Sequence, residues 1–96
     1  MPTLDTLRNR RAEILAVASR HGAHNVRVFG SVMRGEDTPD SDIDLLVDFD
    51  PERSLYDLVG LKMDVETLLG RHADVVTEES LSTYLRQRVL AEASPL

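Results

Sequence analysis

The sequence contains no cysteine and no tryptophan, and aromatic residues make up only 4% of its 96 residues. The lack of cysteine excludes disulfide scaffolds, zinc fingers, iron–sulfur clusters and thiol catalysis. No apolar run approaches the roughly 18 residues that a membrane-spanning helix needs. The first residues, Met1–Asp5, show no apolar segment after a basic start, so we expect no secretory signal, no membrane contact and a cytoplasmic location.

The composition that remains is typical of one small globular domain. Hydrophobic residues make up 42% of the chain and charged residues 29%, which excludes disordered and fibrous classes. A chain of this length is long enough to bury one core and too short to build two. We therefore expect a single domain over residues 1–96.

The charge is unevenly distributed along the chain. The net charge of −6 argues against non-specific binding of nucleic acid. Between residues 36 and 52 there are acids and no bases, whereas the rest of the chain is close to neutral. The acids of this segment are Glu36, Asp37, Asp40, Asp42, Asp44, Asp48, Asp50 and Glu52. This acidic segment requires an explanation.

Hydrophobic periodicity predicts alternating helices and strands. Helical spacing is found over residues 3–21, 54–69 and 78–91, with a short helical turn over 31–34. Alternating or continuous apolar residues predict strands over 25–29, 42–49 and 73–77. This αβ(α)βαβα order predicts an α/β fold in which helices pack on a sheet of three or four strands.

Asp42 and Asp44 are the first candidate site residues. Two residues apart on a strand, they leave the same face of the sheet about 6.5–7 Å apart. Carboxylates this close repel each other, and a divalent cation is the simplest way to offset that repulsion. Oxygen ligands without cysteine favour Mg²⁺ or Mn²⁺ over zinc. The alternative is the solvent face of an edge strand, where aspartates limit aggregation.

Gly30 and Ser31 form a second candidate feature, a turn that directly follows a predicted strand. Glycine permits a close backbone approach there, and free backbone N–H groups favour an anion. Ser31 adds a hydroxyl donor, and Arg34 lies one helical turn further on. No Gly-Lys-Ser/Thr follows, which excludes a Walker-type phosphate loop. An ordinary turn remains the alternative for this dipeptide taken alone.

The two features together resemble a family signature. The string Phe29–Glu36 followed by Ser41–Val47 resembles the DNA polymerase β-like nucleotidyltransferase superfamily, and in particular its minimal nucleotidyltransferase (MNT) branch. The resemblance extends to a third strand that carries Asp74 and to a closing helix, so it covers nearly the whole chain. It implies the nucleotidyltransferase fold, a small mixed β-sheet packed with helices.

The resemblance also implies roles for three carboxylates. Asp42 and Asp44 would hold two Mg²⁺ ions, one at the triphosphate of ATP and one at the attacking hydroxyl, with Mn²⁺ as a possible substitute. Asp74 would complete the second ion's site and help to remove the proton from that hydroxyl. Two metal ions about 4 Å apart stabilise the entering and leaving oxygens of an in-line displacement.

Further roles concern the phosphates and the acceptor. By the same resemblance, Gly30 and Ser31 would bind the β- and γ-phosphates, and Arg34 would neutralise their charge. The chain has no basic stripe for a primer or tRNA, so we expect no direct nucleic-acid partner. Stand-alone minimal members resemble the antitoxin of HEPN/MNT toxin–antitoxin pairs. This implies transfer of AMP from ATP to a tyrosine of a HEPN ribonuclease toxin, which forms a hetero-oligomer with the antitoxin.

Two other functions stay open at this point. One is the same chemistry on a small-molecule hydroxyl, and the other is a non-catalytic antitoxin that neutralises its toxin by contact alone. Four apolar residues near the C-terminus are candidates either for a partner surface or for the core. They are Leu81, Tyr84, Leu85 and Val89.

Overall fold

The computed structural model describes residues 3–96. In this part of the chain the elements follow one another as α1 (Thr3–Asn9), α2 (Arg11–Arg20), β1 (Ala23–Phe29), α3 (Gly30–Arg34), β2 (Ile43–Phe49), α4 (Leu55–Leu69), β3 (Ala73–Val76), the 3-10 helix η1 (Glu78–Ser80), α5 (Thr83–Glu92) and β4 (Ser94–Pro95). The predicted α/β order is confirmed. None of the helices in the described part is long and apolar enough to cross a membrane.

The four strands form one mixed sheet in the order β3-β2-β1-β4. Strand β1 pairs antiparallel with both β2 and β4, whereas β2 and β3 run parallel. Helix α4 makes the crossover between the two parallel strands, as such a pair requires. The capping box of Ser54 and Asp57 begins this helix, and Gly70, with a φ of 66°, ends it.

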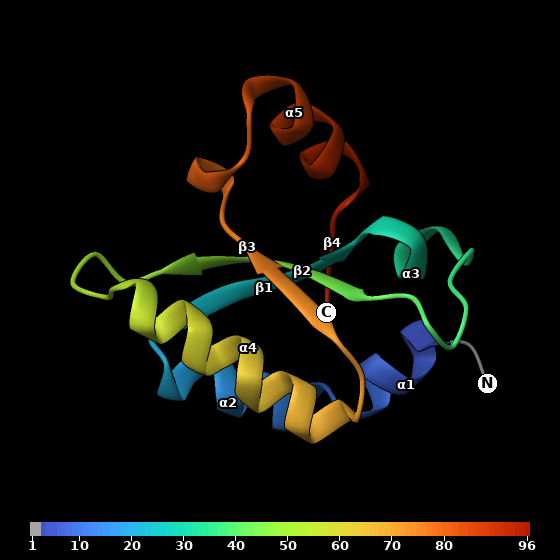
Figure 1. Ribbon diagram of the computed structural model, residues 1–96, viewed down its shortest axis with the longest axis horizontal. Helices are drawn as coiled ribbons and strands as arrows, with labels where there is room; N and C mark the ends of the chain where they lie inside the picture. Colours follow the sequence, from blue (N-terminus) through green and yellow to red (C-terminus); the bar gives the residue numbers. More distant parts are fainter. Residues whose placement is uncertain (1–2) are drawn as a thin grey trace.

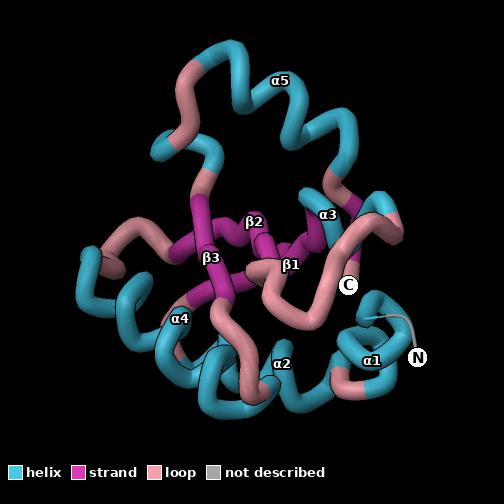
Figure 2. The backbone as a smooth tube through the Cα atoms, turned by 45° about the vertical axis from the view of Figure 1, so that its right-hand side comes forward, coloured by secondary structure: helices cyan, strands magenta, loops and turns pink. Residues whose placement is uncertain are grey.

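Helices cover the two faces of the sheet unequally. Helices α1, α2 and α4 lie together on one face, and the η1–α5 segment arches over the other (Figure 1). Figure 2 shows the same separation after rotation, with α5 on the opposite side of the sheet from α2 and α4. Ile43, Leu45 and Val47 of β2 are almost fully buried in the core cluster. Leu46 points to the opposite face and is also fully buried, so the α5 side of the sheet covers apolar surface as well.

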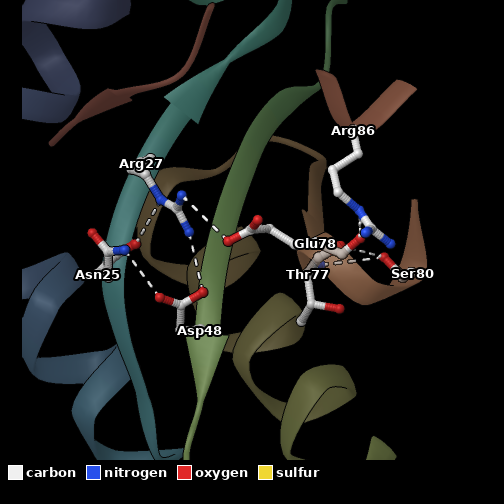
Figure 3. Close-up of polar contacts among 7 residues, drawn as sticks. All are labelled: Asn25, Arg27, Asp48, Thr77, Glu78, Ser80 and Arg86. Carbon is white, nitrogen blue, oxygen red and sulfur yellow. Dashed lines mark hydrogen bonds and ion pairs between the residues drawn. The ribbon is translucent and has the colours of Figure 1, made fainter. Parts of the chain in front are cut away.

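Polar contacts attach the η1–α5 segment to the sheet (Figure 3). Arg27 on β1 donates to Asp48 on β2 at 3.2 Å and lies 4.0 Å from the carboxylate of Glu78 on η1. Asn25 donates to the other oxygen of Asp48 at 2.9 Å, and Arg86 of α5 donates to the Glu78 carbonyl oxygen at 2.9 Å. Since the Arg27 side chain is only 12% exposed, these bonds hold the arch in place from beneath it.

Several local predictions differ from the structure. The helix predicted over residues 78–91 is η1 followed by α5, because Leu81 and Ser82 between them are extended, with ψ of 144° and 158°. The helix predicted over residues 3–21 is two helices, because the backbone of Arg10 leaves the helical conformation at φ −103° and ψ 18°. Strand β1 starts two residues earlier than predicted and contains an irregularity at Asn25, which has a φ of 52°. The short strand β4 was not predicted, since it contains a proline and exists only by pairing with β1.

Candidate active site

Asp44 and Asp74 lie next to each other on neighbouring strands. They are register partners in the parallel pair β2–β3, so both side chains leave the same face of the sheet. That face is the one below η1 and α5, because the following residues, Leu45 and Val75, are buried in the core on the other face. The structure thus brings together two carboxylates that are 30 positions apart in the sequence.

Asp42 lies one residue before β2 and is exposed, so the predicted strand over 42–49 is one residue too long. Pairing with β3 starts at Ile43, whose backbone N–H donates to the carbonyl oxygen of His72 at 2.9 Å. Asp42 is nevertheless close enough to Asp44 to raise the pKa of that carboxyl. All three predicted carboxylates therefore lie at the end of the sheet where β2 and β3 begin.

Gly30 brings the predicted phosphate turn against Asp44. It is the first residue of α3 and has a φ of 77°, which is a conformation that favours glycine. A Cβ atom at this position would lie 2.1 Å from Oδ2 of Asp44, so no other residue fits without moving that carboxylate. Ser31 follows in the first turn of α3 and is half-buried. The turn and the carboxylate pair form one contiguous site.

Arg34 lies at the end of α3 and is held by two carboxylates. Its guanidinium donates to Glu36 at 3.1 Å and to Glu92, near the C-terminal end of α5, at 2.6 Å. These hydrogen bonds and charges, with Glu92 first, raise the pKa of Arg34. The positive charge of Arg34 partly offsets the rise in the pKa of Asp44 that burial and neighbouring acids cause, so the guanidinium acts electrostatically on this carboxylate.

The electrostatics of the site centre on Asp44. Burial raises the pKa of its carboxyl from the ordinary 3.8 to about 6, and the negative charges of Asp74, Asp42 and Glu92 contribute to this rise. Both causes disfavour the ionised form, and the charge of a bound cation would offset them by stabilising the carboxylate. A strongly perturbed carboxyl beside a glycine turn is typical of a functional site.

The donor set fits Mg²⁺ or Mn²⁺. Within residues 3–96 no three carboxylate or imidazole groups stand in an arrangement that would by itself enclose a metal ion. Mg²⁺ rarely uses such an all-protein cage, since it is bound by one or two carboxylates together with substrate phosphates and water. Crowded carboxylates with a raised pKa next to a phosphate-compatible turn match that pattern.

The four apolar residues near the C-terminus have different environments. Val89 is 8% exposed and belongs to the interior, so it is excluded from a partner surface. Leu81 is half-buried. Tyr84 and Leu85 are 70% and 46% exposed on α5, and they remain candidates for contact with a partner.

Glu92 is a residue of the site region that sequence reasoning missed. It lies 58 positions from its partner Arg34 and has no motif around it. Only the fold shows that the end of α5, just before β4 joins the sheet, returns to α3. Glu92 is the one acid of α5, but this becomes visible only once the bounds of that helix are known.

Comparison with known proteins gives a consistent family. The model of the nucleotidyltransferase domain family matches residues 12–95. Protein adenylyltransferase MntA of Thermococcus cleftensis (strain DSM 27260 / KACC 17922 / CL1) is 42% identical over 73 residues, which cover 76% of this chain and 74% of that protein. The family match over residues 12–95 includes the strands and the turn that build the site.

Solved structures agree with this result. A structure provisionally described as a minimal nucleotidyltransferase is 54% identical, with a TM-score of 0.87 over 97% of this chain and 95% of the other. A crystal structure described as a toxin–antitoxin with AMP-PNP is similar with a TM-score of 0.73, covering 91% of this chain and 69% of that chain. At 24% identity, this second likeness concerns the fold alone.

Proposed function

This chain belongs to the nucleotidyltransferase domain family and is a nucleotidyltransferase, and on that premise we propose that it transfers AMP from ATP to a tyrosine hydroxyl of a HEPN ribonuclease toxin and so acts as that toxin's antitoxin. The name of the Thermococcus cleftensis relative, protein adenylyltransferase, supports a protein acceptor. The toxin–antitoxin structure with AMP-PNP has the same fold and motivates the choice of partner and of an adenine nucleotide.

The observation that carries the proposal is the contact between Gly30 and Asp44. The turn lies so close to Asp44 that a Cβ atom at Gly30 would be 2.1 Å from its Oδ2, and this supports binding of a triphosphate and its cation side by side. The register pairing of Asp44 with Asp74 supplies a further carboxylate on the same face. In the proposed reaction, positioning of the reactants and electrostatic stabilisation lower the barrier.

In the proposed reaction, the tyrosine oxygen attacks the α-phosphorus of ATP. The bond between this phosphorus and the bridging oxygen breaks, and pyrophosphate leaves. We assign removal of the hydroxyl proton to Asp74, which is exposed to an incoming acceptor. Mg²⁺ or Mn²⁺ held by Asp42, Asp44 and Asp74, as two ions, would neutralise the triphosphate and the developing charge.

The phosphates are assigned to the turn. The backbone of Gly30 and the hydroxyl of Ser31 would donate to the β- and γ-phosphate oxygens, and the Arg34 guanidinium would provide a fork of donors. Holding the leaving pyrophosphate in this way fixes the direction of departure relative to the acceptor. These residues therefore bind and orient the nucleotide, while the carboxylates act at the reacting atoms.

The test is to co-express the full chain with the product of its genomic neighbour and to weigh both proteins intact. We expect the partner to gain whole AMP units and to lose ribonuclease activity. D44N should reduce the modification by at least about a hundredfold, since a cation in such a site contributes several kcal/mol. D40N, which removes an exposed loop carboxylate of the same charge, should leave it unchanged.

Each other outcome points to one alternative. An unmodified partner that still co-purifies and stays neutralised, also with D44N, would indicate an antitoxin that acts by contact alone. An unmodified partner, together with AMP found on a small hydroxyl compound, would indicate a small-molecule acceptor. Either outcome would overturn the proposed function.

A further inference from the structure

Arg71 links the two chain segments that precede the predicted metal-binding carboxylates. It lies between α4 and β3, three residues before Asp74. Its guanidinium donates to the carbonyl oxygen of Ser41 at 2.6 Å and to that of Thr38 at 3.1 Å. It also donates to the hydroxyl of Thr3 at 3.0 Å.

The partners of Arg71 lie mainly in the loop between α3 and β2. This loop leads from the phosphate turn to the carboxylates, and Asp37, also in it, forms an ion pair with Arg71 at 3.7 Å. Thr38 and Ser41 close a turn of their own, in which the Ser41 N–H donates to the Thr38 carbonyl oxygen at 3.0 Å. Arg71 thus binds both carbonyl oxygens at the ends of this turn.

Asp42 depends on this turn for its position. It follows Ser41 directly and lies outside β2, and on its C-terminal side the Ile43 N–H, in the same peptide unit as the Asp42 carbonyl, donates to the His72 carbonyl oxygen at 2.9 Å. The nearest constraint on its N-terminal side is the bond from Arg71 to the Ser41 carbonyl oxygen, whose carbon belongs to the same peptide unit as the Asp42 nitrogen.

We propose that Arg71 is a positioning residue for nucleotidyl transfer, which fixes Asp42 relative to Asp74 by joining the backbone before one to the backbone before the other. The inference rests on the proposed function, in which both carboxylates hold the nucleotide's cation. The planar guanidinium of arginine suits this positioning role, because it donates to several acceptors in fixed directions. A lysine at this position would carry its charge on a single compact ammonium group. The side chain is 21% exposed, so water competes little for these bonds.

Arg10 provides a matched control. It too is an arginine that donates to a main-chain carbonyl oxygen, that of Leu68, at 2.7 Å. Arg10 stands between α1 and α2, and its guanidinium bonds Leu68 in α4 and Glu13 in α2. R10Q therefore also removes an arginine bond to a main-chain carbonyl oxygen, but only R71Q removes bonds to the loop before Asp42.

The experiment measures the affinity of the full chain for AMP-PNP in the presence of Mn²⁺, together with amide hydrogen exchange and the melting temperature. We expect R71Q to weaken binding about 10- to 100-fold, as loss of a residue that orients metal ligands does. It should also speed exchange at the amides of Ser41 and Ile43. R71K should bind with intermediate affinity. R10Q should lower the melting temperature but leave the affinity unchanged.

The outcomes separate this inference from the proposed function. Wild-type binding that D44N abolishes and R71Q leaves unchanged would overturn the inference alone. Failure of the wild type to bind the nucleotide with Mn²⁺ would overturn the proposed function and the inference with it. If R71Q does not fold, R71K decides, because wild-type affinity in that variant would overturn the inference and reduced affinity would support it.

Discussion

Arg34 of α3 and Glu92 of α5 form an ion pair beside the candidate site, with 2.6 Å between Nη1 and Oε1. Arg34 is the residue to which we assign charge neutralisation of the phosphates. Its guanidinium is therefore already occupied by a carboxylate before a nucleotide binds. Binding requires that phosphate oxygens replace Glu92, or share the guanidinium with it.

Removing the charge of Glu92 should strengthen nucleotide binding. Because a partly exposed ion pair contributes up to about 1 kcal/mol, E92Q should bind ATP about two- to fivefold more tightly. R34Q should bind ATP more weakly than the wild type. Isothermal titration would measure both affinities, and E79Q, which removes an exposed carboxylate on η1, is the control for net charge. Equal affinity in E92Q and E79Q would contradict this prediction.

Adding a methyl group at Gly30 should disrupt both stability and the site. Alanine at a positive φ lowers the free energy of unfolding by about 1–2 kcal/mol. We expect only this loss for G35A, because the added Cβ there meets no atom within 4 Å. G30A should cost at least about 1 kcal/mol more, because the Cβ overlaps the Asp44 carboxylate. Urea unfolding compares the two variants. Binding of Mn²⁺ with ATP should be lost in G30A and kept in G35A.

Neutralising Asp44 should stabilise the metal-free protein at high pH. Since the pKa of folded Asp44 is about 6 and its ordinary value is 3.8, ionisation of this group weakens the folded state as the pH rises through 6. At pH 8 we expect the free energy of unfolding of D44N to exceed that of the wild type by on the order of 1 kcal/mol, a value that allows for the solvent screening of this half-exposed group. Below pH 4 we expect the two free energies to be equal. Urea unfolding with a chelator at both pH values measures this. An equal gain in unfolding free energy at both pH values would contradict the assignment of the effect to the charge of Asp44.

Loss of Arg27 should loosen the η1–α5 arch. R27Q removes the hydrogen bond to Asp48 and the ion pair with Glu78 beneath the arch, and we expect a loss of about 2 kcal/mol of unfolding free energy. R88Q removes only an exposed contact between a guanidinium and the Tyr84 ring, 5.8 Å from its centroid, and should cost less than about 1 kcal/mol. Hydrogen exchange in α5 should rise in R27Q and not in R88Q.

The sequence was sufficient to predict features set by local spacing. The turn at Gly30 follows directly from a strand that ends at Phe29, and the Asp42–Asp44 spacing follows from the two-residue period of a strand. The break at Arg10 was missed, because no proline or glycine marks it in the sequence.

Contacts between distant residues were beyond sequence reasoning. Arg34 meets Glu92 across 58 positions, and Arg71 meets Thr3 across 68. Neither pair has a pattern that distinguishes it from other surface charges, since any arginine and any acceptor are compatible until the fold brings them together. The roles of the predicted site residues stay predictions that the variants above address.

The register pairing of Asp44 with Asp74 makes the site sensitive to the length of the chain between them. In a strand, a shift by one residue turns every side chain to the opposite face. A single insertion or deletion between α4 and β3 that shifted the register of β3 by one residue would turn Asp74 to the face covered by α2 and α4. Ala73 or Val75 would then lie beside Asp44. A change in the length of this short connection therefore alters the composition of the site without replacing any of its residues.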